Sequence, residues 1–268
     1  MGFENFLACV TVLLRQRAAG RLLVPHAKLQ PTLAALRVLG LSSRVAPYQH
    51  ATAKLRAPAA YHEGHFVPAG GAPRGRAVLH VGISAEFAEG AQLAEAAQQH
   101  DVAGQLFGYP DCCSRFFAAA KDGLQDRTAR SVPGLGPYPR DLNPVTPLLH
   151  GFPLLFHFPC SPTCADSLDL MRQRGGWLEA LAPSFRQLRA LGAGIALYHT
   201  QAGGCLVSRY RAVGDGSFLI DEMTAPDPAR IPFLRATTRP MITLHGPHRW
   251  EIADTMYDDP RGFAAIFV

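Results

Sequence analysis

The last third of the chain constrains the fold more than any other part, because it consists of short apolar or alternating runs. Six such runs begin at residues 194, 204, 217, 240, 249 and 263, and turn residues separate them. Runs of this length at such close spacing are typical of a β-meander, in which each strand pairs with the next one along the chain. We therefore expect an antiparallel sheet over residues 193–268.

The first part of the chain, residues 1–83, predicts helices followed by a strand. Residues 3–14 have apolar side chains at helical spacing and predict an amphipathic helix docked on the core. A second helix is expected over residues 31–41 and a strand over residues 77–84. Residues 55–76 are rich in Gly, Pro and Ala, and they predict a loop.

The middle of the chain, residues 84–192, predicts helices. Ser84 is a good N-cap for a helix that continues through His100. Residues 165–194 predict two helical stretches that break at the Gly-Gly pair 175–176. The expected fold class is therefore α+β, with a helical, cysteine-bearing middle and a C-terminal antiparallel sheet, all within one compact domain.

The composition excludes several classes of protein. With 268 residues, of which 48% are hydrophobic and 18% charged, the chain can bury a full core without a metal or disulfides. The net charge is +5, but no run of four or more basic residues occurs, so we do not expect a nucleic-acid partner. The N-terminal apolar run is too short to span a bilayer, so we expect no membrane association. A cytoplasmic location, where thiols stay reduced, is the expectation that follows.

Four of the six cysteines lie in two short windows, GYPDCCSRFF at residues 108–117 and HFPCSPTC at residues 157–164. In the first window Asp111 is a good helix N-cap, so Cys112 and Cys113 would occupy the first two positions of a helix. At a helix start, N–H groups without a partner in the helix and the positive end of the dipole stabilise a thiolate.

The second window predicts the same arrangement. Ser161 is a good N-cap, and Pro162 would take the first helical position, where proline is favoured. Cys164 would then lie at the third helical position and Cys160 just before the cap. All four sulfur atoms are therefore expected at helix N-termini.

Two local pairs of ligands, far apart in the sequence, are the common construction of a metal site. The spacing of Cys160 and Cys164 suits zinc. Adjacent side chains at a helix start point about 100° apart, so Cys112 and Cys113 would reach two corners of a larger cluster more easily than one small ion. We therefore expect an iron–sulfur cluster, 4Fe–4S ahead of other types, with zinc as the alternative cofactor.

Three interpretations without a metal stay open. The cysteines could be ordinary core thiols, because cysteine is among the most buried residue types. They could form a disulfide or a redox-active pair such as Cys160 and Cys164, or one thiolate could act as a nucleophile. Cys9 and Cys205 lie in an apolar helix and a strand, and we interpret both as packing thiols.

The two windows together resemble those of an uncharacterised bacterial and archaeal family, a domain of unknown function, whose members carry GYP-x-CC-x-x-FF followed by H-x-PCS-x-x-C. This resemblance covers roughly the middle third of the chain and implies that the two windows belong together, without implying an activity. The cysteine layout is also similar to that of non-cobalamin epoxyqueuosine reductases and of the cysteine-rich domain of heterodisulfide reductases, which hold iron–sulfur clusters. The latter have Gly where this chain has Ser114.

The principal hypothesis is a metal-binding enzyme, an iron–sulfur oxidoreductase or lyase, or an electron-handling protein. Its ligands would be the four cysteines, with His157 and Asp111 as acid–base groups and Tyr109 as a wall of the site. The expected partners are a small-molecule or peptide substrate and an electron-donor protein. The alternative is a structural zinc module that binds a protein or peptide.

Overall fold

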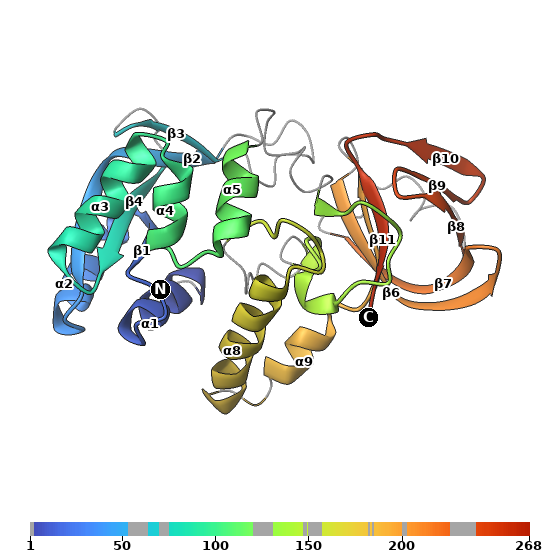
Figure 1. Ribbon diagram of the computed structural model, residues 1–268, viewed down its shortest axis with the longest axis horizontal. Coiled ribbons are helices and arrows are strands. Elements are labelled where there is room, and N and C mark those ends of the chain that lie inside the picture. Colours follow the sequence, from blue (N-terminus) through green and yellow to red (C-terminus); the bar gives the residue numbers. More distant parts are fainter. Residues whose placement is uncertain are drawn as a thin grey trace. The chain divides into compact units, whose positions relative to one another are not determined.

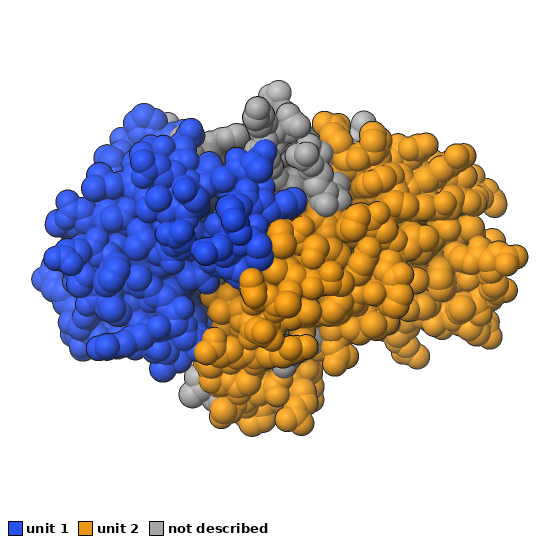
Figure 2. Space-filling model, viewed as in Figure 1, with its two compact units in different colours: residues 1–55, 63–121 blue, residues 56–62, 122–268 orange. Residues whose placement is uncertain are grey.

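The computed structural model divides the chain into two compact units, which Figure 2 shows in different colours. The first unit comprises residues 1–55 and 63–121, and the second comprises residues 56–62 and 122–268. The residues that the structure describes are 3–52, 64–69, 75–119, 131–146, 149, 157–181, 183, 185–199, 203–225 and 240–268.

The first unit contains a four-stranded antiparallel sheet in the order β1-β4-β2-β3. Its strands are β1 (Ala19–Pro25), β2 (Ser42–Thr52), β3 (Gly64–Pro68) and β4 (Arg76–Gly82).

The sequence predicts β4 but neither β1 nor β2. In β2, the polar residues and Pro47 obscure the strand pattern, and the proline is tolerated because the register with β4 shifts between Val45 and Gln49. The loop predicted over residues 55–76 is wrong for residues 64–68, which form β3, and for Arg76, which begins β4. Residues 55–63 and 70–74 of that prediction lie outside the described residues.

The first unit also contains α1 (Phe3–Leu13), the 3-10 turn η1 (His26–Lys28), α2 (Leu29–Val38), α3 (Ala85–Ala96), α4 (His100–Leu106) and α5 (Asp111–Ala119) (Figure 1). The predicted cap of α3 is confirmed, because the Ser84 hydroxyl accepts a hydrogen bond from the Phe87 amide at 3.4 Å. The helix does not continue through His100. It ends at Ala96, and Gln98 turns the chain with a φ of 55°.

The two faces of this sheet pack differently. Successive side chains of β4 alternate between the faces, so Leu79 and Val81 lie in a hydrophobic core with residues of α1 and α2. His80, between them, points to the other face and forms a hydrogen bond with Glu95 of α3. The inner side of α3 is made of alanines, which let the helix lie close to the sheet: Ala88, Ala91 and Ala94.

Among its described residues, the second unit contains the 3-10 turn η3 (Arg140–Leu142) and the helices α8 (Ala165–Leu181) and α9 (Phe185–Ala190). The predicted break at Gly175 and Gly176 is wrong, because α8 continues through both glycines. A buried stripe at helical spacing outweighs the low helix propensity of glycine: Ser167, Met171, Arg174 and Leu178.

The second unit also holds a seven-stranded antiparallel sheet in the order β10-β9-β8-β7-β6-β5-β11. Its strands are β5 (Gly194–His199), β6 (Gly203–Gly214), β7 (Ser217–Thr224), β8 (Met241–Gly246), β9 (Arg249–Ile252), β10 (Thr255–Asp258) and β11 (Phe263–Phe267). The predicted meander is confirmed from β5 to β10, and β11 returns to pair with β5.

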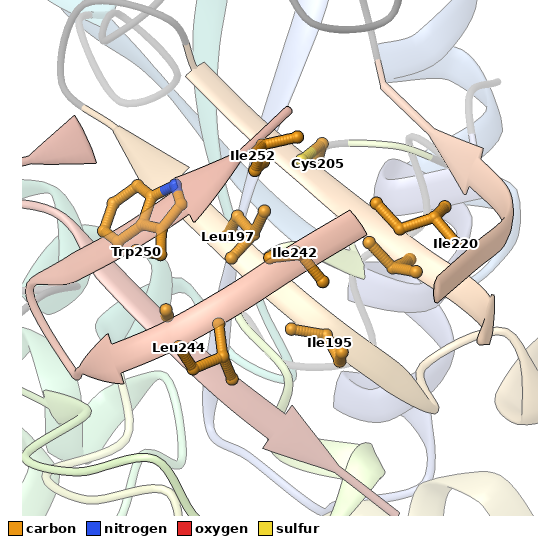
Figure 3. Packing of buried hydrophobic residues seen from close by; sticks show 10 residues of the cluster. Ile195, Leu197, Cys205, Ile220, Ile242, Leu244, Trp250 and Ile252 are labelled. Atoms are coloured by element: carbon orange, nitrogen blue, oxygen red, sulfur yellow. The ribbon is translucent and has the colours of Figure 1, made fainter. Parts of the chain in front are cut away.

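One predicted strand of this sheet is a hairpin instead. The run that begins at residue 249 contains β9 and the start of β10, because Ala253 and Asp254 form a tight turn with φ values of 47° and 64°. Figure 3 shows the apolar side chains that close the core of the sheet, among them Trp250, Ile195 and Ile242.

The α+β class with a helical, cysteine-bearing middle and a C-terminal antiparallel sheet is therefore confirmed. Among the described residues, no helix combines the length and the apolar character that a membrane span requires.

Candidate metal centre

The first cysteine pair lies in the first turn of α5. The amides of Cys113 and Ser114 donate hydrogen bonds to the Pro110 carbonyl at 3.0 Å and 2.9 Å. The cap position therefore belongs to Pro110, and Asp111 is the first helical residue rather than the N-cap that the sequence predicts. Cys112 and Cys113 move one position along, to the second and third residues of α5, and remain at the positive end of the helix.

Close packing between α4 and α5 positions this helix start. A Cβ atom at Gly104 would come within 2.9 Å of the Ser114 Cβ atom, so glycine is the residue that permits the approach. Gly108 has a φ of 66°, and the Tyr109 amide then bonds the Gly104 carbonyl at 2.8 Å. The turn between α4 and α5, which positions Cys112, thus depends on Gly104 and Gly108.

The second cysteine pair frames a turn before α8. The Ser161 hydroxyl accepts a hydrogen bond from the Thr163 amide at 3.3 Å, and the Ser161 carbonyl accepts one from the Cys164 amide at 3.2 Å. The first helical hydrogen bond runs from the Leu168 amide to the Cys164 carbonyl at 3.0 Å. Ser161 therefore caps the turn, and Cys164 itself takes the N-cap position of α8.

This arrangement corrects the prediction for the second window. Pro162 is not the first helical residue, because α8 begins at Ala165. Cys164 remains at a helix N-terminus, whereas Cys160 lies four residues ahead of it in the turn. Three of the four sulfur atoms therefore belong to residues at helix starts.

The sulfur atoms of Cys112, Cys113, Cys160 and Cys164 all lie within 4.8 Å of one another. The Cys112 and Cys113 sulfurs are 3.8 Å apart. That separation is far longer than a disulfide bond of about 2.05 Å, so the two are separate thiols. The adjacent side chains do not diverge as the sequence predicts, since their sulfur atoms lie only 3.8 Å apart. Four thiols at these distances can bind a metal.

The group of clustered ligand atoms consists of these four sulfurs, with no histidine or carboxylate from the described residues. His157 places its Nε2 atom 2.9 Å from the Ser167 hydroxyl. Burial, and secondly the charge of Arg174, lower the pKa of His157 to about 3. The imidazole is therefore neutral at pH 7. The acid–base role of His157 stays a prediction.

The other two predicted site residues lie around the start of α5. Tyr109 is half-buried and packs against Phe107, with 5.7 Å between the ring centroids. Asp111 is exposed in the first turn. The acid–base role of Asp111 and the role of Tyr109 as a wall of the site also stay predictions.

Cys9 and Cys205 differ from the clustered cysteines in their surroundings. Both are buried in hydrophobic cores, at 3% and 2% exposure. Burial raises the pKa of Cys9 to about 11 and that of Cys205 to about 12. Each is therefore a neutral thiol at physiological pH, as expected of a packing residue.

A polar cluster that the sequence analysis misses lies around Glu95 on α3. Its carboxylate accepts hydrogen bonds from His80 Nε2 at 2.9 Å, from Tyr48 Oη at 3.1 Å, and from the Arg21 guanidinium. Burial raises the pKa of Glu95, but the charge of Arg21 and the hydrogen bond from His80 outweigh it and bring the pKa to about 2. The one sign of this cluster in the sequence is a polar residue, His80, at an inward position of the apolar strand β4.

Comparison of the chain with protein-family models, with curated proteins and with solved structures finds no match. The resemblance of the two cysteine windows to an uncharacterised family stays a prediction.

Proposed function

We propose that Cys112, Cys113, Cys160 and Cys164 bind one tetrahedral metal ion, and that this ion is zinc. The observation that carries the proposal is the gathering of four sulfurs within 4.8 Å, with the Cys112 and Cys113 sulfurs 3.8 Å apart.

The sulfur separation supports a single ion rather than a cluster. A Zn–S bond of about 2.3 Å in tetrahedral geometry places neighbouring sulfurs about 3.8 Å apart. In a 4Fe–4S cluster each cysteine binds a different iron, and the iron and sulfide atoms lie inside the set of cysteine sulfurs. The cysteine sulfurs of a cluster are therefore farther apart than those around one ion, and 3.8 Å fits the smaller site.

The helix ends support a negatively charged centre. Four thiolates around a divalent ion carry a net charge of −2. Cys113 lies in the first turn of α5, and Cys164 occupies the N-cap position of α8. The positive ends of both helices therefore stabilise the charge of their own cysteine.

Four protein ligands complete a tetrahedron and leave no position for a water molecule or a substrate. Catalytic zinc sites keep one position open, whereas structural sites are closed. The proposed function of this centre is therefore structural, with folding of the two cysteine windows coupled to metal binding. Sulfur ligands in a closed tetrahedral set are typical of structural zinc.

Metal analysis and absorption spectroscopy of protein purified without oxygen test the proposal. We expect a colourless protein with about one zinc per chain. A brown protein with broad visible absorbance and about four irons per chain would overturn the single-ion proposal in favour of a cluster.

Single substitutions test the ligand set. Each of the variants Cys112→Ser, Cys113→Ser, Cys160→Ser and Cys164→Ser should lose the zinc. The matched control is Cys205→Ala, which removes a buried thiol from the sheet core and should keep a full zinc content. Retention of zinc by a serine variant would exclude that cysteine from the ligand set.

A further inference from the structure

The four clustered cysteines differ in exposure, and the difference repeats in both windows. Cys113 and Cys164 are buried, at 1% and 7% exposure, whereas Cys112 and Cys160 are only half-buried. Each pair therefore combines one partly exposed residue with one buried residue. Oxidants attack thiolates that they can reach, so Cys112 and Cys160 are the reactive members.

We propose that the centre is a redox switch, an inference that rests on the zinc site proposed above. A peroxide converts Cys112 and Cys160 into a disulfide, and the zinc ion is released. Cys113 and Cys164 stay reduced.

The reaction balances with peroxide as the only oxidant. The thiolate of Cys112 attacks the O–O bond, forms a sulfenic acid and expels hydroxide. The thiolate of Cys160 then attacks that sulfur, forms the S–S bond and expels a second hydroxide. Two protons from solvent convert the hydroxides to water. The two sulfurs lose two electrons in all, the peroxide gains them, and zinc keeps its oxidation state.

The geometry selects this pair of cysteines. The sulfurs of Cys112 and Cys160 lie within 4.8 Å of each other, so small movements bring them to bonding distance. Cys112 and Cys113 are a poor pair, because Cα atoms of adjacent residues are about 3.8 Å apart and disulfides usually need at least about 4.4 Å. The same disulfide results whichever exposed cysteine reacts first. Zinc is then left with two ligands of four and dissociates.

The test adds hydrogen peroxide to zinc-loaded full-length protein in the presence of a colorimetric zinc chelator, with mass spectrometry of the digest to map disulfides. We expect release of the bound zinc together with a Cys112–Cys160 linkage, and recovery of zinc binding after treatment with a reducing thiol. Zinc that stays bound, or zinc released without this linkage, would overturn the switch and leave the zinc site intact. Protein that never holds zinc would instead refute the proposed function.

A matched variant separates oxidation of this pair from general damage. Cys160→His offers a three-cysteine, one-histidine site of a kind that holds zinc, but it cannot form the disulfide. Its peroxide-driven zinc release should be at least about tenfold slower than that of the wild type. Equal rates would contradict the proposal. The disulfide map of the wild-type protein decides the proposal even if the variant binds zinc weakly.

Discussion

Replacing Glu95 with glutamine should destabilise the first unit by about 3 kcal/mol at neutral pH. The pKa of Glu95 is lowered from 4.5 to about 2, and each unit is equivalent to about 1.4 kcal/mol. The side chain is only 12% exposed, so solvent screens little of the interaction. Glutamine keeps the size of the side chain and removes the charge that Arg21 and His80 stabilise.

The effect should depend on pH in a definite direction. The folded-state pKa of Glu95 is depressed, so its contribution is fully present above pH 4.5 and is lost as the pH falls through about 2. About 1.4 kcal/mol of it should remain at pH 3. Urea unfolding, followed by pulsed hydrogen exchange in peptides from β1 and β4, measures the free energy of unfolding of this unit at pH 5, 3 and 2.

The matched control is Glu89→Gln on the same helix. Glu89 pairs with Arg44 at 3.0 Å, but both side chains are about half exposed, so the change should cost less than about 1 kcal/mol. The reasoning is wrong if Glu95→Gln costs no more than Glu89→Gln at pH 5. A cost that is the same at pH 5 and pH 2 would refute the electrostatic explanation.

Gly104→Ala should lower the free energy of unfolding by about 1–3 kcal/mol, because its Cβ atom would press on Ser114; an unchanged melting temperature would contradict this. Gly176→Ala should raise stability by up to about 1 kcal/mol, because nothing among the described residues lies within 4 Å of the added atom; a lower melting temperature would refute it. Cys9 and Cys205 should resist iodoacetamide at pH 8, since burial raises the pKa of their thiols to about 11 and about 12; rapid labelling of the native protein would exclude this.

The two sheets differ in how far the sequence predicts them. In the second unit, each strand from β5 to β10 pairs with the next one along the chain. Local alternation and turn residues are therefore enough to predict this part of the sheet. In the first unit the order β1-β4-β2-β3 pairs strands that are distant in the chain. Its strand β2 also contains Pro47 and several polar residues, and only the tertiary pairing makes this segment a strand.

The candidate site was predictable in its membership but not in its geometry. Capping rules are local and place Cys112, Cys113 and Cys164 near helix starts. For α5, the rules place the N-cap one residue after Pro110, which is the observed cap. For α8, they predict Ser161 as the N-cap, whereas Ser161 caps a separate turn and Cys164 is the N-cap. Helix periodicity alone does not predict the 3.8 Å separation of the adjacent sulfurs, because it does not fix the side-chain rotamers.

The Glu95 cluster was not predictable from local patterns. Its partners His80, Tyr48 and Arg21 come from three strands that the sequence does not bring together. A charged residue on a helix ordinarily indicates a solvated face. Here the alanines of α3 bring the helix close to the sheet, and the carboxylate is enclosed among hydrogen-bond donors.

X-ray absorption spectroscopy of the purified protein tests the central claim most directly, because it reports the ligands and neighbours of the metal. A single zinc ion held by the four cysteines predicts one shell of four sulfur atoms at about 2.3 Å and no nearby second metal. An iron edge with a metal–metal distance would contradict the account, as would a zinc ion with nitrogen or oxygen ligands in place of the sulfurs.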